Sequence, residues 1–221
     1  GPVLNKASYI KLLKKNFFNK KINFINSPSL EAQVAAISDD IAYNNHDLED
    51  GLRADLFKIE DLNSIPFISN FIKYHIKNIK KFRKEVIINQ IVRNLINAMV
   101  IDVINTTKKN LKKYNPQRIS DIYKLNLFIV DFSDKMKKVD SEIKKFLKFK
   151  MYNNKKVIKN TNEGKKIIKN LFNYILKKPK MYISKEVLQK ISKERAVADF
   201  IAGMTDRYAI NLHKTIKWIY F

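Results

Sequence analysis

An aspartate, a tyrosine and a second aspartate stand at intervals of four in the stretch AISDDIAYNNHDLEDGLRAD, residues 36–55. They are Asp39, Tyr43 and Asp47. On a helix from residue 29 to about residue 49, this spacing places all three in one column along one face. Such a column could contribute to a metal site, pack against a sugar or a ring, and accept a hydrogen bond from a hydroxyl group.

In a second interpretation, the acids of this helix form a solvated face that offsets the charge of nearby lysines. These acids are Asp39, Asp40, Asp47, Glu49 and Asp50. Two features bear on the choice. No lysine occurs between residues 30 and 53, unlike in the other predicted helices. An adjacent apolar stripe should also pack this helix on the rest of the fold. The stripe consists of Leu30, Val34, Ile37 and Ile41.

Lysine dominates the charge of the chain. The net charge is +23, and 38 of the 44 basic residues are lysine because arginine occurs only six times. A charge of this size is typical of proteins that bind nucleic acids, but the readout of bases relies on arginine. Compositional drift toward lysine explains the charge equally well, so nucleic acid remains an alternative partner.

Several classes of protein are excluded by what the sequence lacks. The absence of cysteine removes disulfides, thiolate metal sites and cysteine nucleophiles. The four glycines are far apart, which excludes glycine-rich phosphate loops. The most apolar window, residues 86–104, contains Arg93 and Asp102, so we expect no membrane span. We also recognise no signal peptide and expect a cytoplasmic protein.

Apolar residues recur at helical spacing through most of the chain, which predicts an all-α fold of about seven helices. We expect these stripes to form the core; they include Ile88, Leu95, Met99, Ile104, Ile168, Leu171, Ile175, Val197 and Tyr208. Pro28, Pro116 and Pro179 fit helix boundaries. Only LNLFIVDF, residues 125–132, has the pattern of a short strand, so we expect at most one short strand or hairpin. No linker or repeat stands out, and residues 1–221 are treated as a single helical region.

Two long motifs carry a resemblance to a known family. The segment SLEAQVAAISDDIAYNNHDLEDGLRA resembles the last metal-ligand helix of the deoxyguanosinetriphosphate triphosphohydrolase-like proteins, which belong to the HD-domain superfamily. RAVADFIAGMTDRYAINLHK, residues 195–214, is similar to the C-terminal signature of that family. FSDKMKKVDSEIKKFLKFKMY and LFNYILKKPKMY match it between these ends, so the resemblance spans essentially the whole chain.

The resemblance implies a function and a set of roles. Family members hydrolyse a deoxynucleoside triphosphate to the deoxynucleoside and inorganic triphosphate, using a divalent metal such as Mg²⁺ or Mn²⁺ held by a His, a His-Asp pair and a final Asp. The final Asp corresponds to Asp39. Tyr43 and Asp47 correspond to positions that contact the deoxyribose, the tyrosine by packing and the aspartate through the 3′-hydroxyl. His46 precedes an aspartate but matches no ligand position of the family, and we interpret it as a packed or surface histidine. His75 and His213 match no ligand position either, and we interpret His213 as a residue on a helix surface.

The upstream His and the His-Asp pair of the family have no counterpart in this sequence. Residues 1–16, GPVLNKASYIKLLKKN, look like the end of the segment that carries them, so the chain resembles the C-terminal portion of a larger enzyme. No catalytic set is complete in this chain, and we expect the chain alone to be inactive. Expected partners are a deoxynucleoside triphosphate, a separate N-terminal fragment and further copies of the chain. The alternative is a non-catalytic subunit or remnant that binds a nucleotide or nucleic acid.

Overall fold

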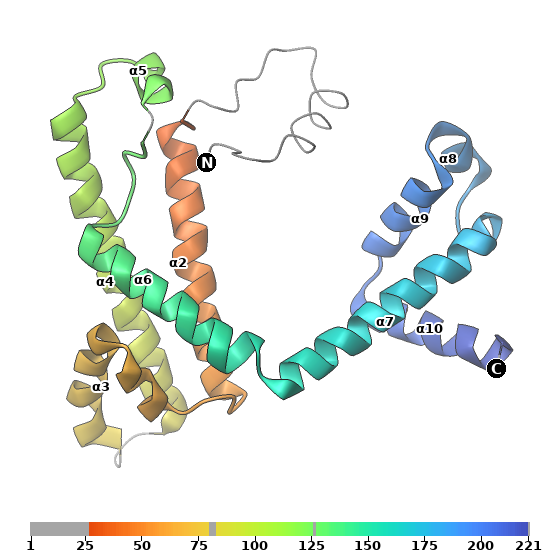
Figure 1. The fold of residues 1–221 in the computed structure, drawn as a ribbon, viewed down its shortest axis with the longest axis horizontal. Coiled ribbons are helices and arrows are strands. Elements are labelled where there is room, and N and C mark those ends of the chain that lie inside the picture. Colours follow the sequence, from red (N-terminus) through yellow and green to blue (C-terminus); the bar gives the residue numbers. More distant parts are fainter. Residues whose placement is uncertain (1–26, 80–82, 126, 221) are drawn as a thin grey trace. The chain divides into compact units, whose positions relative to one another are not determined.

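The computed structural model describes residues 27–79, 83–125 and 127–220, except for the side chains of 74–79 and 217–220. It is 82% helical, and none of the described residues forms a strand, which confirms the all-α prediction. The packing contacts divide the chain into two compact units that meet between Met151 and Tyr152 (Figure 1). The N-terminal motif GPVLNKASYIKLLKKN lies outside the described residues.

The first unit is built around a pair of long helices. Helix α2 packs on α4 and α6, and α3 packs on α4 and on the short 3₁₀ helix η1. Figure 1 shows α2 and α4 side by side, with α6 crossing both. The elements of this unit, up to a π-helical turn at its end, are α2 Leu30–Arg53, η1 Ile59–Ser64, α3 Pro66–Ile79, α4 Lys84–Tyr114, α5 Ile119–Lys124, α6 Asp134–Leu147 and η2 Lys148–Tyr152.

Helix α2 begins at Leu30, one residue after the predicted start at residue 29. Ser29 is the N-cap, and its hydroxyl accepts a hydrogen bond from the backbone N–H of Ala32 at 3.3 Å. Ser27 is buried, and its hydroxyl donates to the carbonyl oxygens of Leu125 and Leu127. The helix runs to Arg53, past the predicted end near residue 49.

The core of the first unit lies between α2, α4 and α6. The predicted apolar stripe of α4 supplies its centre, with Ile88, Leu95 and Met99 at most 1% exposed. The stripe is narrower than predicted, because Ile104 is 46% exposed. At the other end of α4, Asn115 adopts a left-handed backbone (φ 40°) and closes the helix just before Pro116, where the sequence predicted a boundary.

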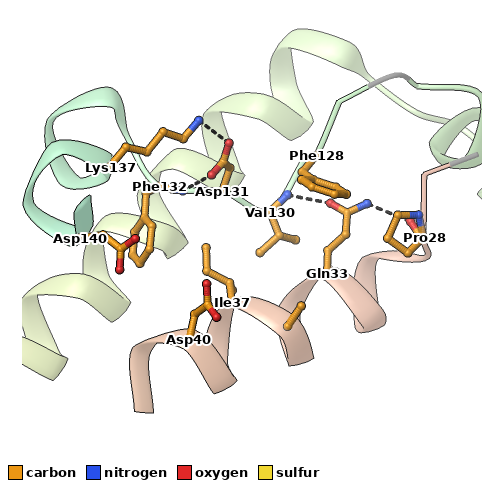
Figure 2. Close-up of a pocket in the computed structure, with 11 residues that line it drawn as sticks. Pro28, Gln33, Ile37, Asp40, Phe128, Val130, Asp131, Phe132, Lys137 and Asp140 are labelled. Atoms are coloured by element: carbon orange, nitrogen blue, oxygen red, sulfur yellow. Dashed lines mark hydrogen bonds and ion pairs between the residues drawn. The ribbon is translucent and has the colours of Figure 1, made fainter. Parts of the chain in front are cut away.

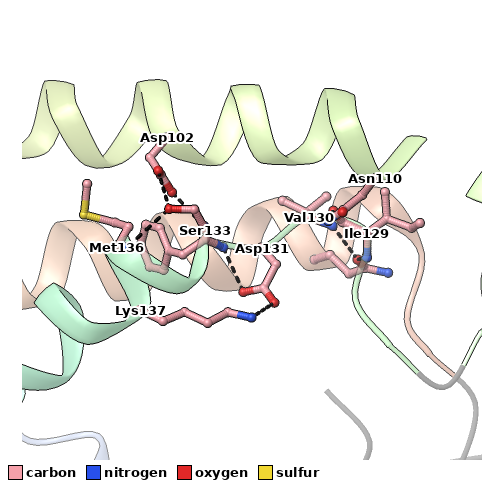
Figure 3. A network of polar contacts seen from close by, with 10 residues as sticks. Asp102, Asn110, Ile129, Val130, Asp131, Ser133, Met136 and Lys137 are labelled. Carbon is pink, nitrogen blue, oxygen red and sulfur yellow. Dashed lines mark hydrogen bonds and ion pairs between the residues drawn. The ribbon is translucent and has the colours of Figure 1, made fainter. Parts of the chain in front are cut away.

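The predicted strand at residues 125–132 is wrong. The described part of this segment is irregular, because side chains satisfy its backbone in place of a partner strand. The buried amide of Gln33 accepts hydrogen bonds from the N–H groups of Ile129 (2.9 Å) and Val130 (3.1 Å). Asn110 donates to the carbonyl of Ile129 at 2.9 Å (Figure 3).

Asp102 explains why a charge interrupts the apolar α4 window. Its carboxylate accepts hydrogen bonds from the N–H (2.8 Å) and the hydroxyl (2.7 Å) of Ser133. The same hydroxyl caps α6 by accepting from the N–H of Met136 at 3.2 Å (Figure 3). The carboxylate therefore fixes the start of α6 against α4.

By length and composition, α4 is the one helix among the described residues that could cross a membrane. The core helix of a soluble protein passes the same test, so our expectation of no membrane span stays a prediction. Leu95 and Met99 of α4 are fully buried against neighbouring helices, as in the core helix of a globular unit.

The second unit is helical throughout its described part. Its elements are α7 Lys155–Lys177, the 3₁₀ turn η3 Pro179–Met181, α8 Lys185–Lys190, α9 Lys193–Ala202 and α10 Asp206–Tyr220. Leu171 and Ile175 of α7 pack against Val197 of α9, as the helical periodicity predicted. Two predicted core positions are wrong, because Ile168 is 47% and Tyr208 51% exposed.

Candidate functional site

The predicted column exists on α2. Asp39, Tyr43 and Asp47 all lie within the helix Leu30–Arg53, so their spacing of four places them on one face. Asp39 is exposed, the Tyr43 ring is 58% exposed, and Asp47 is partly buried. The opposite face carries Ile41, buried in the core of the first unit.

Residues around the column are also uncovered in this unit. We call this surface the bare face of α2, and it consists of Ala32, Ala35, Ala36, Asp39, Ala42, Tyr43, His46 and Asp50, all of which are exposed. Four of the eight are alanine, so half of this face consists of small apolar side chains. Outside the face, Val34 of the predicted packing stripe is 48% exposed, so the prediction that it is packed is wrong.

A complete metal site is not formed within the part of the chain that the structure describes, where no three His, Asp or Glu residues are grouped to hold an ion. Asp39 makes no hydrogen bond or ion pair with another described residue. A single carboxylate does not provide the ligand number that Mg²⁺ or Mn²⁺ requires. The described residues alone therefore do not fit the implied metal.

His46 lies on the bare face but has a local contact. Its Nδ1 is 3.9 Å from a carboxylate oxygen of Glu49, one turn further along α2, and its side chain is 66% exposed. Glu49 is held more closely by Arg53, at 2.7 Å. These contacts fit the interpretation of His46 as a surface residue. The side chain of His75 is not among those described.

A pocket of about 310 Å³ borders the bare face on one side (Figure 2). Its α2 wall includes Ala36 of the bare face and its neighbour Asp40. The facing wall comes from the irregular segment and from α6, with Phe128, Phe132 and Asp140 among the lining residues. The pocket thus combines apolar surface with carboxylates, and Ala36 and Asp40 lie within one turn of Asp39 on α2.

Lys144 ties the α2 and α6 walls of this pocket together. Its ammonium is 2.9 Å from Asp140 and 3.1 Å from Asp40, and Asn44 donates to Asp140 at 2.9 Å. Partial burial opposes the charged form of Lys144, but the hydrogen bonds to Asp140 and Asp40 outweigh it and raise the pKa of the ammonium. Lys137 forms a second ion pair with Asp131 at the pocket edge (Figure 2).

The sequence did not single out these pocket residues. Asp40 was counted only as a solvated acid, and Asp131 and Asp140 were not considered. A signal existed, because the family-like stretch FSDKMKKVDSEIKKFLKFKMY contains Lys137, Asp140 and Lys144 at helical spacings of three and four. What the spacing could not reveal is that this stretch faces α2.

His213 corrects a second interpretation. We expected a residue on the helix surface, but its side chain is only 9% exposed, and its Nε2 lies 3.0 Å from the amide nitrogen of Asn170 on α7. The histidine therefore joins α10 to α7 inside the second unit.

The fold and its motifs define a class of protein. Residues 130–215 match the family described as the phosphohydrolase-associated domain. The presence of this domain fits the all-helical architecture described above.

Individual relatives identify the kind of protein more narrowly than the domain does. The chain is 50% identical over 216 residues to a deoxyguanosinetriphosphate triphosphohydrolase-like protein of Pelagibacter ubique, a match that covers 98% of this chain and 58% of that protein. Proteins of the same name match at 37% identity in Agrobacterium fabrum (85% of this chain, 48% of that protein) and at 35% in Parvibaculum lavamentivorans (83% and 48%). The chain thus spans about half the length of the curated relatives it matches.

These findings confirm the resemblance seen in the sequence. The chain is homologous to the C-terminal part of the deoxyguanosinetriphosphate triphosphohydrolase-like proteins. At the level of the family, the names of the relatives support a hydrolase.

Proposed function

We propose that this chain supplies the C-terminal portion of a divalent-metal-dependent deoxynucleoside triphosphate triphosphohydrolase, which converts a deoxynucleoside triphosphate and water to the deoxynucleoside and triphosphate. The observation that carries the proposal is the bare face of α2. It presents Asp39 and Tyr43, and the partly buried Asp47 continues their column at its edge, free of lysine, on a helix whose other face is buried in the core. The names of the relatives indicate deoxyguanosine triphosphate as the first substrate to test.

Each residue of the column has a distinct role in this proposal. Asp39 would be one ligand of Mg²⁺ or Mn²⁺, a hard cation that prefers oxygen ligands and lends positive charge to a phosphate group. The exposed ring of Tyr43 offers a flat apolar surface on which a deoxyribose can pack. Asp47 would accept a hydrogen bond from the 3′-hydroxyl.

The remaining ligands of the metal must come from outside the described residues. The relatives are roughly twice as long as the part that this chain matches, and we propose that their additional part corresponds to what covers the bare face. The four exposed alanines favour this, because small side chains allow the backbone of a neighbouring element to approach closely.

A chimera tests the proposal directly. The C-terminal part of the Pelagibacter ubique relative is replaced by this chain, and release of inorganic triphosphate from dGTP is measured with Mg²⁺ or Mn²⁺. We expect activity, and a loss of at least about a hundredfold on Asp39→Ala, because losing a metal ligand should cost no less than losing a supporting residue. Lys165→Ala, an exposed position on α7, is the matched control and should keep full activity.

The chain alone provides a second arm of the test. Purified chain with dGTP and either metal should release no triphosphate. Accumulation of triphosphate in that assay would contradict the proposal that the site is completed from elsewhere. An active chimera that is indifferent to Asp39→Ala would instead show that another residue holds the metal.

The alternative is a non-catalytic subunit that binds a nucleotide or nucleic acid. The observation that favours it is the exposed, lysine-rich first half of α7, where every residue from 155 to 170 except Val157 and Ile167 is exposed. Binding of this kind releases counterions, so retention on DNA would fall steeply with salt. An inactive chimera together with strongly salt-dependent DNA retention would favour this alternative.

A further inference from the structure

The second unit contains a pocket that the proposed reaction does not use. The volume of this pocket is about 570 Å³. Four lysines line it, and we call it the basic pocket; they are Lys177, Lys178, Lys180 and Lys193. The remaining lining residues are Pro179, Met181 and Leu188, so the pocket combines cations with apolar surface and includes no acid.

The lysines of the basic pocket come from separate elements. Lys177 ends α7, Lys180 lies in the 3₁₀ turn η3, and Lys193 is the first residue of α9. None of these three forms an ion pair with another residue in the described part of the chain. Among the described residues, therefore, no carboxylate within 4 Å of these three ammonium groups offsets their positive charge.

Helix dipoles account for only part of this arrangement. A lysine in the last turn of α7, such as Lys177, is favoured by the negative end of the helix. Lys193 is disfavoured by its helix, because the N-terminus of α9 is the positive end of that helix. The helices themselves thus give no reason for the convergence of these charges on one concavity.

The frame that holds these lysines is rigid. In the turn, the N–H groups of Tyr182 (3.0 Å) and Ile183 (2.9 Å) donate to the carbonyl of Pro179. The ring of Tyr182 packs against those of Tyr174 and Phe200, with centroids 6.2 Å and 6.0 Å away. A turn fixed in this way holds the backbone positions from which the lysines extend, which lowers the entropic cost of binding an anion.

We propose that the basic pocket binds a small molecule that carries two or more linked phosphate groups and an apolar or aromatic part. The lysines would neutralise the phosphates as point charges. Met181, which is 67% exposed, would be covered by the apolar part. A nucleic acid strand is the less suitable ligand, because no arginine and no aromatic ring lines the pocket to read or stack bases.

The test uses the full chain with two probes, ATP and inorganic triphosphate, in EDTA at 0.15 M KCl, where the Debye length is about 8 Å. EDTA removes the divalent metal that the proposed reaction at α2 requires, and ATP is not a deoxynucleotide. Binding measured in this way is therefore independent of that reaction. The pocket variant is Lys177→Gln with Lys180→Gln and Lys193→Gln. The control carries Lys159→Gln, Lys165→Gln and Lys166→Gln, which remove the same charge from the exposed half of α7.

Calorimetric titration should show binding of both probes to the unmodified chain. The pocket variant should lose at least about tenfold in affinity for both, and the control less than about twofold, as expected from general electrostatics. Met181→Ser should weaken ATP severalfold and leave inorganic triphosphate unchanged. All the altered side chains are exposed, so unchanged thermal unfolding is expected and verifies folding.

Three results would overturn the proposal. The first is no binding of either probe to the unmodified chain. The second is an equal loss in the pocket variant and the control, which would mean attraction to net charge alone. The third is tight binding of a 20-nucleotide oligothymidylate that depends on the pocket lysines while ATP does not bind, which would identify a nucleic acid site.

Discussion

Helices α2 and α7 are similar in length, with 24 and 23 residues, and each is left partly uncovered by its own unit. Their exposed residues differ in kind. Seven residues of α7 are lysine, and α2 contains none. Exposure alone therefore does not make a helix basic in this chain. We infer that the six lysines between residues 155 and 169 of α7 form an ordinary solvated surface, whereas the bare face of α2 contacts a ligand or another element.

The two faces of α2 also differ, because one is buried in the core and the other is exposed. The largest loss of stability is expected for a substitution on the buried face. Leu48 is 1% exposed, and Leu48→Ala should lower the free energy of unfolding by about 2–5 kcal/mol through lost burial and the cavity it leaves. Urea denaturation measures this. A loss below about 1 kcal/mol would mean that α2 is not packed on α4 as described.

Gln33 joins α2 to the irregular segment at residues 125–132 through hydrogen bonds. It is 4% exposed and bonds the N–H groups of Ile129 and Val130 and the carbonyl of Pro28. Gln33→Ala leaves these groups without partners and should cost about 2–3 kcal/mol. Hydrogen exchange at the amides of Ile129 and Val130 should accelerate in the variant. Unchanged hydrogen exchange at these amides would mean that Gln33 does not hold this segment in place.

A substitution of Lys144, which pairs with Asp40 beside the bare face, should have a smaller effect on stability. Lys144→Met should lower the free energy of unfolding by less than about 1 kcal/mol, because the lysine side chain is 45% exposed and screened by solvent. The folded state raises the pKa of Lys144, so its contribution is complete below the ordinary lysine value of 10.5 and is lost as the pH rises through the raised value. The difference between the unmodified chain and the variant should be constant from pH 6 to about pH 9 and then shrink.

The smallest effects are expected on the bare face itself. Tyr43→Ala and Asp39→Asn should each change the free energy of unfolding by less than about 0.5 kcal/mol, because both side chains are exposed. Urea denaturation of the two variants, beside that of Leu48→Ala, completes the comparison of the two faces. A loss of 2 kcal/mol in either would show that the residue supports the fold and would remove the reason for giving it a functional role.

Much of this architecture was predictable from periodicity. The α4 stripe and the column on α2 follow from spacings of three and four, and Asn115 and Pro116 mark a boundary by local backbone chemistry. The strand prediction failed at residues 125–132 because alternation does not reveal whether a partner strand exists. Gln33, almost a hundred residues away, supplies the hydrogen bonds instead.

The candidate site was predictable only in part, for a related reason. Asp39, Tyr43 and Asp47 share one helix, so spacing alone brings them together. Asp40, Asp140 and Lys144 come together through the packing of α6 on α2, which no local pattern records. The burial of His213 is also a tertiary effect, since its own helix gives it no reason to be covered.

The most direct test of the bare face and its edge as a substrate surface is whether Asp47, at that edge, contacts the 3′-hydroxyl. In the chimera with the Pelagibacter ubique relative, kcat/KM is compared for dGTP and for 2′,3′-dideoxyguanosine triphosphate, with and without Asp47→Ala. We expect the unmodified chimera to prefer dGTP by about tenfold or more, as for one hydrogen bond to a charged group, and Asp47→Ala to abolish this preference. An unchanged preference in the variant would contradict the assignment of this face to the deoxyribose.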